Sequence, residues 1–327
     1  MSSPFYPDQQ WLHDRWTRTV RDRVFEGATA SSAPVVVLLG GQPGAGKTAA
    51  AGRASQLHPG QQPIVLEGDD YRRFHPDYKQ LVRDDPLRMP EVTQSVSGPM
   101  VAAAVDHAQR ERISVVLEGT FRDPAMVTDT AAEFHRAGFA VDAVVVAVPP
   151  VQSLISTVDR YVSSVENDQD GRWTPVAAHD AALAGMPATV QALGESEYVD
   201  QVTIMARDGS ILQDLTGPAT VERGRAAGRA VIDEQRRPLT SPERSAWLQL
   251  HDRLEQSFRD VPALHRIRNE PEVRRSWEQL DQARAYVIAT TGSTATDRPG
   301  PVREAAPQLG SHLARTMRRE QGSGCER

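Results

Sequence analysis

Cysteine and lysine are almost absent from this chain of 327 residues. The one cysteine, Cys325, lies near the end of the chain, so the protein cannot form an internal disulfide or a cysteine-based zinc site. This composition fits the reducing cytoplasm. Of the 37 basic residues, only Lys47 and Lys79 are lysines. Because arginine serves almost everywhere else, each of these two lysines is a candidate for a specific role.

A net positive charge and a long apolar run are also missing. The formal net charge is -6 at pH 7, so no overall positive field attracts a phosphate backbone, and we expect no nucleic-acid partner. The N-terminus reads MSSPFYPDQQWLHDRW, which is polar and acidic where a signal peptide is basic and then apolar. No uninterrupted apolar stretch approaches the ~20 residues of a membrane span. We therefore expect a cytoplasmic protein without a membrane partner.

Short apolar runs alternate with helix-length polar segments in the first half of the chain. Four valine-rich runs lie at Val35–Leu39, Ile64–Leu66, Ile113–Leu117 and Val141–Val148. This alternation is typical of βαβ units and of a parallel sheet that is buried on both faces. A further strand is expected at Val199–Ala206, closed by a turn at 207–209. The sequence therefore predicts a doubly wound α/β fold of the P-loop kinase type, with a mainly parallel sheet and helices on both faces.

Helical periodicity accounts for both ends of the chain. Residues 5–27 carry apolar side chains at helical spacing and are expected to form one amphipathic helix. Further helices are predicted at about Thr174–Leu193, Val221–Gln235, Pro242–Phe258 and Pro271–Ile288. We therefore predict a kinase domain at 1–215, a C-terminal helical extension forming an accessory region at 216–289, and a largely disordered tail at 290–327.

The most specific motif follows the first predicted strand. It has the pattern G-x-x-x-x-G-K-T and consists of Gly41, Gln42, Pro43, Gly44, Ala45, Gly46, Lys47 and Thr48. Glycines let backbone N–H groups converge on phosphate oxygens, the lysine reaches the terminal phosphates, and the threonine can bind Mg²⁺. A glycine-rich turn without a ligand is the alternative. The strand–loop–helix context and the retained Lys47 favour a Walker A loop that binds ATP and Mg²⁺.

Carboxylates follow the next two predicted strands. Asp69 and Asp70 come after the second run, and Glu118 directly follows the third. Because open α/β sheets build their sites at the carboxyl ends of strands, Asp69 and Glu118 should face the same crevice as Lys47. A carboxylate there can accept the proton of an attacking hydroxyl, hold Mg²⁺ through water, or orient a substrate. The alternative is capping of a helix that begins at Tyr71, which we favour for Asp70, whereas we favour the site for Asp69.

A third group comprises Arg160, Arg172 and His179. Arginines that reach from a lid-like segment commonly stabilise the charge of a transferring phosphoryl group. An arginine in an arginine-rich chain is nevertheless more often a solvated surface residue, and a histidine at a helix start more often caps or packs. Spacing alone therefore predicts no catalytic role for these three residues.

The ordered set of motifs resembles the zeta toxin family, P-loop kinases of bacterial toxin–antitoxin systems that phosphorylate UDP-N-acetylglucosamine and related UDP-sugars. The similarity covers about residues 35–208. Besides the Walker A loop, it rests on Asp69-Asp70-Tyr71, His75-Pro76-Asp77-Tyr78, Leu117-Glu118-Gly119-Thr120, Ala147-Val148-Pro149, Arg160-Tyr161, and Arg172-Trp173-Thr174-Pro175 with His179-Asp180. Each segment alone is weak, and the specificity comes from their order.

The resemblance implies an ATP-dependent phosphotransferase with an alcohol group as acceptor. It implies that Lys47 and Thr48 bind the ATP phosphates and Mg²⁺, and that Asp69 activates the sugar hydroxyl and helps to hold the metal. Arg160 and Arg172 become the arginines on the transferring phosphate. The residues expected to line the substrate side are Glu118, Thr120, Arg122 and Thr130. The resemblance also implies that an antitoxin protein is a candidate partner.

One position departs from the family pattern. Ala102 stands where the family has a glutamate that contacts the sugar nucleotide. This departure leaves open a kinase for another small alcohol, such as an antibiotic. A non-catalytic switch, in which ATP binding reorganises the C-terminal helices, is the alternative from a different functional class.

Overall fold

Six strands form one sheet in the order β2-β3-β1-β4-β5-β6 in the computed structural model, which describes residues 5–58 and 60–289. The strands are β1 (Val35–Gly40), β2 (Ile64–Leu66), β3 (Val115–Gly119), β4 (Ala140–Val146), β5 (Gln201–Met205) and β6 (Ile211–Leu215). The first five run parallel to one another, and β6 pairs antiparallel with β5. The predicted α/β class with a mainly parallel sheet is confirmed.

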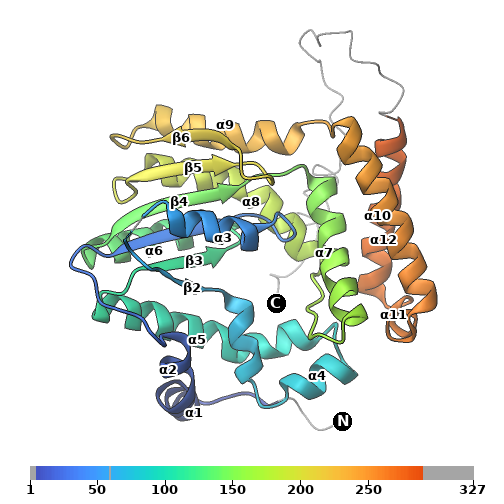
Figure 1. The fold of residues 1–327 in the computed structure, drawn as a ribbon, viewed down its shortest axis with the longest axis horizontal. Coiled ribbons are helices and arrows are strands. Elements are labelled where there is room, and N and C mark those ends of the chain that lie inside the picture. Colours follow the sequence, from blue (N-terminus) through green and yellow to red (C-terminus); the bar gives the residue numbers. More distant parts are fainter. Residues whose placement is uncertain (1–4, 59, 290–327) are drawn as a thin grey trace, which may run out of the picture.

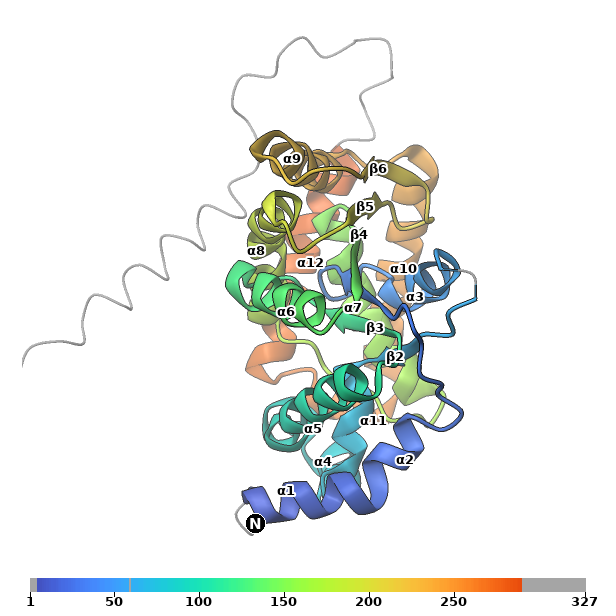
Figure 2. The ribbon, with the colours of Figure 1, turned by 90° about the vertical axis from the view of Figure 1, so that its left-hand side faces the viewer.

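Side chains of successive strand residues point to opposite faces of the sheet, and both faces are covered. Val36 and Leu38 of β1 pack in one hydrophobic cluster, whereas Val37 and Leu39 pack in another. The helices whose buried side chains join the first cluster are α5 (Met89–Glu111), α6 (Pro124–Arg136), α8 (Val176–Glu195) and α9 (Val221–Arg236). Helix α3 (Lys47–Gln56) covers the other face. Figure 2 shows this two-sided arrangement around the sheet.

A second hydrophobic core lies beside the sheet. It is formed by α7 (Pro150–Glu166), α10 (Ser241–Asp260), α11 (Pro262–Ile267) and α12 (Pro271–Ala289). Helix α7 lies between the sheet and the C-terminal helices (Figure 1). The indole Nε1 of Trp247 on α10 donates to the main-chain oxygen of Val151 on α7 at 2.9 Å. The C-terminal helices therefore pack on the helix that borders the carboxyl ends of the strands.

The N-terminal segment forms three helical pieces where we expected one helix over residues 5–27. They are α1 (Gln9–Arg15), a π-helical turn (Trp16–Val20) and α2 (Arg21–Val24). The segment still acts as one amphipathic element, because Trp16, Val20 and Phe25 all pack in the first cluster. Two short elements, the 3₁₀ helix Gly68–Phe74 and α4 (Tyr78–Asp84), connect β2 to α5.

The structure differs from the predicted strands in two main respects: where the third strand begins, and one additional strand. The third strand begins at Val115, since Ile113 still belongs to the turn that ends α5, where its N–H donates to Ala108 at 2.9 Å. Strand β6 was not predicted at all. It is an edge strand in which Ile211 and Leu212 are exposed. Its sequence, ILQDL, does not alternate between apolar and polar residues as a half-buried strand does. Helix α11 was also missed.

The accessory region predicted at 216–289 divides between the two cores. Helix α9 packs with the sheet through Ala227 and Val231, whereas α10 to α12 belong to the second core. The domain boundary at residue 215 stays a prediction. The tail predicted at 290–327 lies outside the described residues. Within the described ranges, none of the helices combines the length and apolarity that crossing a bilayer requires.

Candidate active site

The predicted Walker A loop joins β1 to α3. Gly44 and Gly46 adopt φ values of 79° and 96°, which an L side chain rarely adopts. A Cβ atom on Gly44 would lie 2.1 Å from the main-chain oxygen of Ser153, so α7 presses directly on the loop. Helix α3 begins at Lys47, and its first N–H groups face the end of the loop. This geometry is that of an anion-binding helix start.

Lys47 folds back over this loop. Its Nζ donates to the main-chain oxygen of Gly41 at 2.9 Å and lies 3.5 Å from Oε1 of Glu118. Burial lowers the pKa of Lys47, and the charge of Glu118 opposes this effect. The structure thus brings the first residue of α3 next to Glu118 in β3, the strand that pairs with β1, as the sequence predicted for one crevice.

Asp69 lies in the first turn of the 3₁₀ helix that follows β2, and two arginines hold it. Its Oδ1 accepts from Nε of Arg72 at 2.8 Å, and its Oδ2 accepts from Nε of Arg172 at 2.7 Å. Burial alone would raise the pKa of the Asp69 carboxyl, but Arg172 and Arg72 together lower it below the ordinary value. Asp69 is therefore a fixed, ionised carboxylate.

Arg160 approaches the same place from α7. Its Nη2 donates to Oγ1 of Thr174 at 3.1 Å. Burial, followed by the charge of Arg172, lowers the pKa of Arg160, whereas Asp69 and neighbouring glutamates raise it. Two arginines from α7 and from the segment before α8 therefore converge on the carboxylates at the ends of β2 and β3.

Glu67 is a further member of this group, and our sequence interpretation gave it no role. Burial, followed by the charges of Glu118 and Asp69, raises the pKa of Glu67 to about 7. The sequence signal that could have identified Glu67 is its position directly after β2. We assigned that strand end to Asp69 alone, because sequence does not show which side chain of an acidic run is buried.

Other site predictions have mixed outcomes. The capping role favoured for Asp70 is wrong, because the helix begins at Gly68 and the Asp70 carboxylate accepts from Arg73.

Thr48 is exposed at the start of α3. On the expected substrate side, Arg122 is exposed, and the Thr130 hydroxyl donates to Met126 within α6 at 2.8 Å. Thr120 directly follows β3 and is half-buried. The substrate roles of these residues stay predictions.

A residue from the β5–β6 turn also reaches the Walker A loop. Nη1 of Arg207 donates to the main-chain oxygen of Gly44 at 3.0 Å. The two residues are 163 positions apart, so no local pattern predicts their contact. Gly44 is consequently held from two sides, by Arg207 and by α7.

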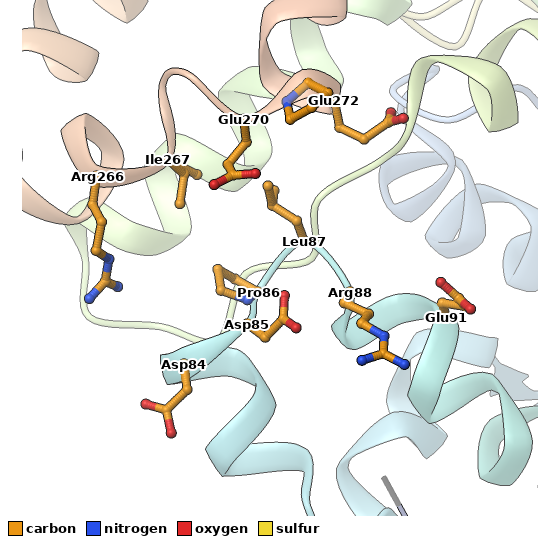
Figure 3. Close-up of a pocket in the computed structure, with 11 residues that line it drawn as sticks. Asp84, Asp85, Pro86, Leu87, Arg88, Glu91, Arg266, Ile267, Glu270 and Glu272 are labelled. Atoms are coloured by element: carbon orange, nitrogen blue, oxygen red, sulfur yellow. The ribbon is translucent and has the colours of Figure 1, made fainter. Parts of the chain in front are cut away.

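A cavity of about 470 Å³ lies apart from this loop, between the segment that joins α4 to α5 and the segment that joins α11 to α12 (Figure 3). Its acidic side chains are Asp84, Asp85, Glu91, Glu270 and Glu272, against two arginines, Arg88 and Arg266. Because carboxylates outnumber guanidinium groups there, this cavity is a poor place for a nucleotide polyphosphate. The phosphate-binding candidate remains the Walker A loop.

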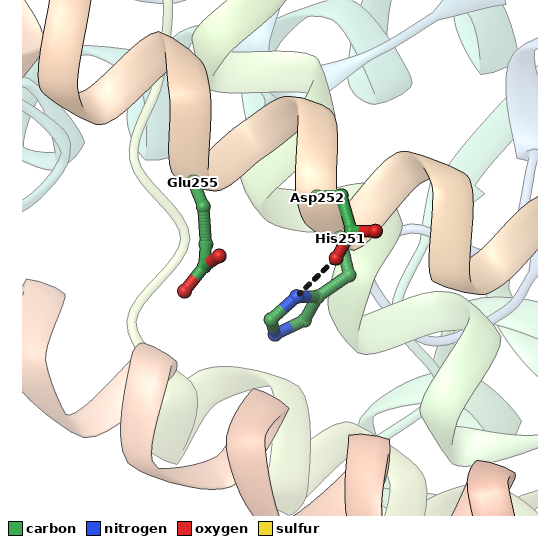
Figure 4. A group of neighbouring side chains, drawn as sticks. All are labelled: His251, Asp252 and Glu255. Carbon is green, nitrogen blue, oxygen red and sulfur yellow. Dashed lines mark ion pairs between the residues drawn. The ribbon is translucent and has the colours of Figure 1, made fainter.

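His251, Asp252 and Glu255 form a group on α10 in which one ligand atom of each lies within 4.8 Å of the others (Figure 4). The ring nitrogens of His251 lie 3.8 Å from Asp252 and 3.4 Å from Asp281. Arg284 lies 3.5 Å from Asp252. These neighbours belong to α10 and α12, so the group lies outside the predicted site.

Comparison with known proteins now bears on the identity of this site. The family model for the zeta toxin matches residues 20–214, which include the Walker A loop and both arginines. The chain belongs to the zeta toxin family. Toxin zeta of Enterococcus hirae is 29% identical over 192 residues, which cover 58% of this chain and 66% of that protein. Toxin PezT of Streptococcus pneumoniae serotype 4 is 30% identical over 210 residues, which cover 64% of this chain and 82% of that protein.

A solved structure agrees with this zeta-toxin assignment at the level of the fold. It comes from the characterisation of the PezAT chromosomal toxin–antitoxin system of Streptococcus pneumoniae, and it matches with a TM-score of 0.64 at 23% sequence identity. The match covers 79% of this chain and 99% of that chain. The protein is thus a zeta-toxin-family member with a kinase-like α/β fold and a C-terminal set of helices.

Proposed function

We propose that this protein is an ATP-dependent kinase that transfers the γ-phosphate to a hydroxyl group of a small molecule. Lys47 and the backbone of the Walker A loop bind the phosphates. Asp69 receives or orients the acceptor hydroxyl, and Arg160 and Arg172 stabilise the charge on the transferring phosphoryl group. The observation that carries this proposal is the convergence of Asp69, Arg160 and Arg172 beside the loop that holds Lys47.

The charge pattern supports phosphoryl transfer over simple anion binding. A plain anion site needs cations alone, whereas this group interleaves guanidinium groups with carboxylates. Phosphoryl transfer needs both kinds, because cations stabilise the equatorial oxygens and a carboxylate handles the attacking hydroxyl. Arg172 contacts Asp69 directly, so the proposed base and the proposed phosphate ligand lie within one hydrogen bond of each other.

The cofactors we propose are ATP and Mg²⁺. The exposed Thr48 hydroxyl lies at the start of α3, next to the phosphate loop, and is free to turn toward a metal ion bound to ATP. Both oxygens of Asp69 already accept from arginines, so Asp69 suits a contact to Mg²⁺ through water better than direct binding. The bound ion would neutralise charge on the phosphates.

For the acceptor we propose a UDP-activated amino sugar such as UDP-N-acetylglucosamine. Family membership supports this choice, and Glu118, Thr120, Arg122 and Thr130 are the proposed substrate-side residues. Ala102, which is exposed on α5 in place of a sugar-contacting glutamate, favours a second candidate, namely a different small alcohol such as an antibiotic.

We further propose an antitoxin protein as partner and the cytoplasm as location. Relatives are named toxins, and the matched structure belongs to a toxin–antitoxin system. A kinase of this type needs ATP and a nucleotide sugar, both of which are cytoplasmic metabolites. Co-purification with the product of an adjacent gene would test the partner.

The decisive experiment is a transfer assay with γ-labelled ATP and Mg²⁺. One reaction contains UDP-N-acetylglucosamine as acceptor, and a second contains a pool of small-molecule alcohols that includes antibiotics. Each reaction is repeated with the Lys47→Ala protein as the negative control. Label in the UDP-sugar supports the full proposal, and label only in the pool supports the second candidate. Release of free phosphate alone, with no labelled acceptor, would instead support a non-catalytic switch.

A further inference from the structure

A line of buried and half-buried hydrogen bonds runs from the Walker A loop to the C-terminal helices. Nε2 of Gln42 lies 3.4 Å from Oγ of Ser153 on α7, and this Oγ lies 2.9 Å from Nε2 of His179 on α8. Nδ1 of His179 lies 3.1 Å from Oδ1 of Asp180, whose Oδ2 accepts from Nε2 of Gln279 on α12 at 3.2 Å. Side chains from the loop and from three helices are thus joined.

One set of proton positions satisfies the whole line. The ionised carboxylate of Asp180 only accepts, so Nδ1 of His179 carries the proton that it donates there. Nε2 of His179 then accepts from the Ser153 hydroxyl, whose other acceptor within reach is the main-chain oxygen of Pro150 at 3.0 Å, and the hydroxyl oxygen accepts from the amide of Gln42. The Asp180 carboxylate thus fixes the orientation of the His179 ring, and the ring fixes the orientation of the Ser153 hydroxyl, which faces the loop.

The order serine, histidine, aspartate is that of a nucleophilic triad, but access rules out that role. Ser153 is 0% exposed and His179 is 2% exposed, so a substrate cannot reach the hydroxyl. Gln42 is also fully buried, and its Nε2 donates to the main-chain oxygen of Val148 at 2.9 Å. These side chains therefore act on the protein itself, at the root of the phosphate-binding loop.

Ser153 holds the loop at two points. Its hydroxyl lies 3.4 Å from the amide nitrogen of Gln42. Its main-chain oxygen would lie only 2.1 Å from a Cβ atom on Gly44, so the loop and α7 are in close contact there. A shift of Ser153 would therefore move the backbone N–H groups of the loop that bind phosphate. Since Gln279 ends the same line, hydrogen bonds connect α12 to the phosphate-binding loop.

We propose that Ser153, His179 and Asp180 are positioning residues that hold the Walker A loop in its phosphate-binding form through Gln42, and that α12 supports them through Gln279. This inference rests on the proposed kinase function. It gives the helices after residue 236 a role in nucleotide affinity. It also gives a role to the His179-Asp180 pair of the motif set.

The test compares two substitutions on α12 in the full chain. Gln279→Leu removes the amide that donates to Asp180, and Gln282→Leu is the matched control at an exposed position of the same helix. We expect Gln279→Leu to weaken ATP·Mg²⁺ binding by about threefold to tenfold, as the loss of one hydrogen bond predicts. The KM for ATP should rise by the same factor, with a smaller change in kcat. The control should bind like the wild type. Thermal midpoints of both variants without ATP show that each protein is folded at the temperature of the binding measurement.

A double-mutant cycle then tests the line itself. If Ser153 transmits the effect, Gln279→Leu should no longer weaken ATP binding in a Ser153→Ala background. Equal ATP affinities of wild type and Gln279→Leu, or effects of the two substitutions that multiply, would overturn the inference. A wild-type protein that binds no ATP overturns both this inference and the kinase proposal. A protein that binds ATP and shows the coupling, yet phosphorylates no acceptor, overturns the kinase proposal alone.

Discussion

Arg172 and Asp69 are 103 residues apart in the chain, and they meet through a hydrogen bond of 2.7 Å. Asp69 follows β2, whereas Arg172 precedes α8, so the contact closes the strand-end site from the opposite side. It also keeps the pKa of Asp69 low although burial would raise it. A base with a low pKa acts more by position than by proton affinity. In the proposed mechanism, Arg172 therefore positions the Asp69 carboxylate and also stabilises the transferring phosphate.

The two lysines of the chain provide the first prediction. Lys47→Ala should lower phosphoryl transfer by at least about 10²-fold, because it removes the cation that contacts the terminal phosphates. Lys79→Ala is the control, since Lys79 is exposed on α4. Initial rates with labelled ATP measure both. A Lys47→Ala protein as active as the control would contradict the Walker A assignment.

The second prediction concerns the two site arginines. Arg160→Ala and Arg172→Ala should each lower kcat by roughly 10³-fold, the range for arginines that stabilise a transferring phosphoryl group. Arg73→Ala should retain activity, because Arg73 is exposed and pairs only with exposed Asp70 among the described residues. Thermal unfolding checks that all three variants are folded. Near-normal kcat in both site variants would show that the family roles do not apply to this segment.

Local sequence patterns were sufficient to predict most of the parallel part of the sheet. Valine-rich runs indicate where β1 and β4 lie, because strands buried on both faces are mainly apolar. The short apolar run of β2 was also recognised, although β2 is an edge strand whose Val65 is exposed. The start of β3 was misplaced, since the identity of Ile113 does not show that it still belongs to the C-terminal turn of α5. Strand β6 escaped notice because an edge strand need not bury either face.

Some residues of the candidate site could likewise be predicted from the sequence, and others could not. Lys47 and Asp69 lie in the elements that follow β1 and β2, and Glu118 lies near the C-terminal end of β3, so topology alone brings all three to one edge of the sheet. Glu67 was missed because its raised pKa depends on burial and on neighbouring charges, neither of which sequence displays. The contacts of Ser153 with Gln42 and of Gln279 with Asp180 span 111 and 99 residues, so they follow only from the packing of α7, α8 and α12.

The third prediction follows from the raised pKa of Glu67. Its folded-state pKa of about 7 lies above the ordinary 4.5, so the fold favours the neutral form. This contribution to the free energy of unfolding is complete below pH 4.5 and is lost as the pH rises to about 7. Glu67→Gln should therefore be more stable than wild type at pH 8, by on the order of 1–2 kcal/mol after allowance for solvent screening. Urea unfolding from pH 5 to 8 measures the difference, and a constant difference would contradict it.

The fourth prediction tests the boundary at residue 215. Ala227 and Val231 of α9 are fully buried in the first core, and a Cβ on Gly194 of α8 would lie 2.7 Å from the Cα of Gly224. Chain 1–237 should therefore be more stable to urea than chain 1–215, by about 2–4 kcal/mol from the buried apolar area. Equal unfolding midpoints would show instead that α9 is accessory, as the sequence alone suggested.

The last prediction separates nucleotide binding from chemistry at Asp69. Asp69→Asn keeps the shape of the side chain, but the amide cannot accept the proton of the acceptor hydroxyl. ATP affinity should change little, and turnover should fall by roughly 10²–10⁴-fold, the usual contribution of a positioned general base. The matched control is Asp70→Asn, which alters the neighbouring carboxylate, exposed and paired with Arg73.

The geometry makes this comparison informative. The side-chain nitrogen that Asp69→Asn introduces can accept no hydrogen bond, so the variant cannot accept from Arg72 and Arg172 with both terminal atoms at once. A displaced Arg172 is therefore a second source of lost turnover. The two sources differ in their pH dependence, because loss of the base removes the acidic limb of the kcat profile, whereas a displaced arginine lowers kcat equally at every pH. Calorimetry with ATP measures binding, and turnover measured down to about pH 3 covers the acidic limb, because the Asp69 pKa lies below its ordinary value of 3.8. Equal turnover of the two asparagine variants would show that Asp69 is not the base.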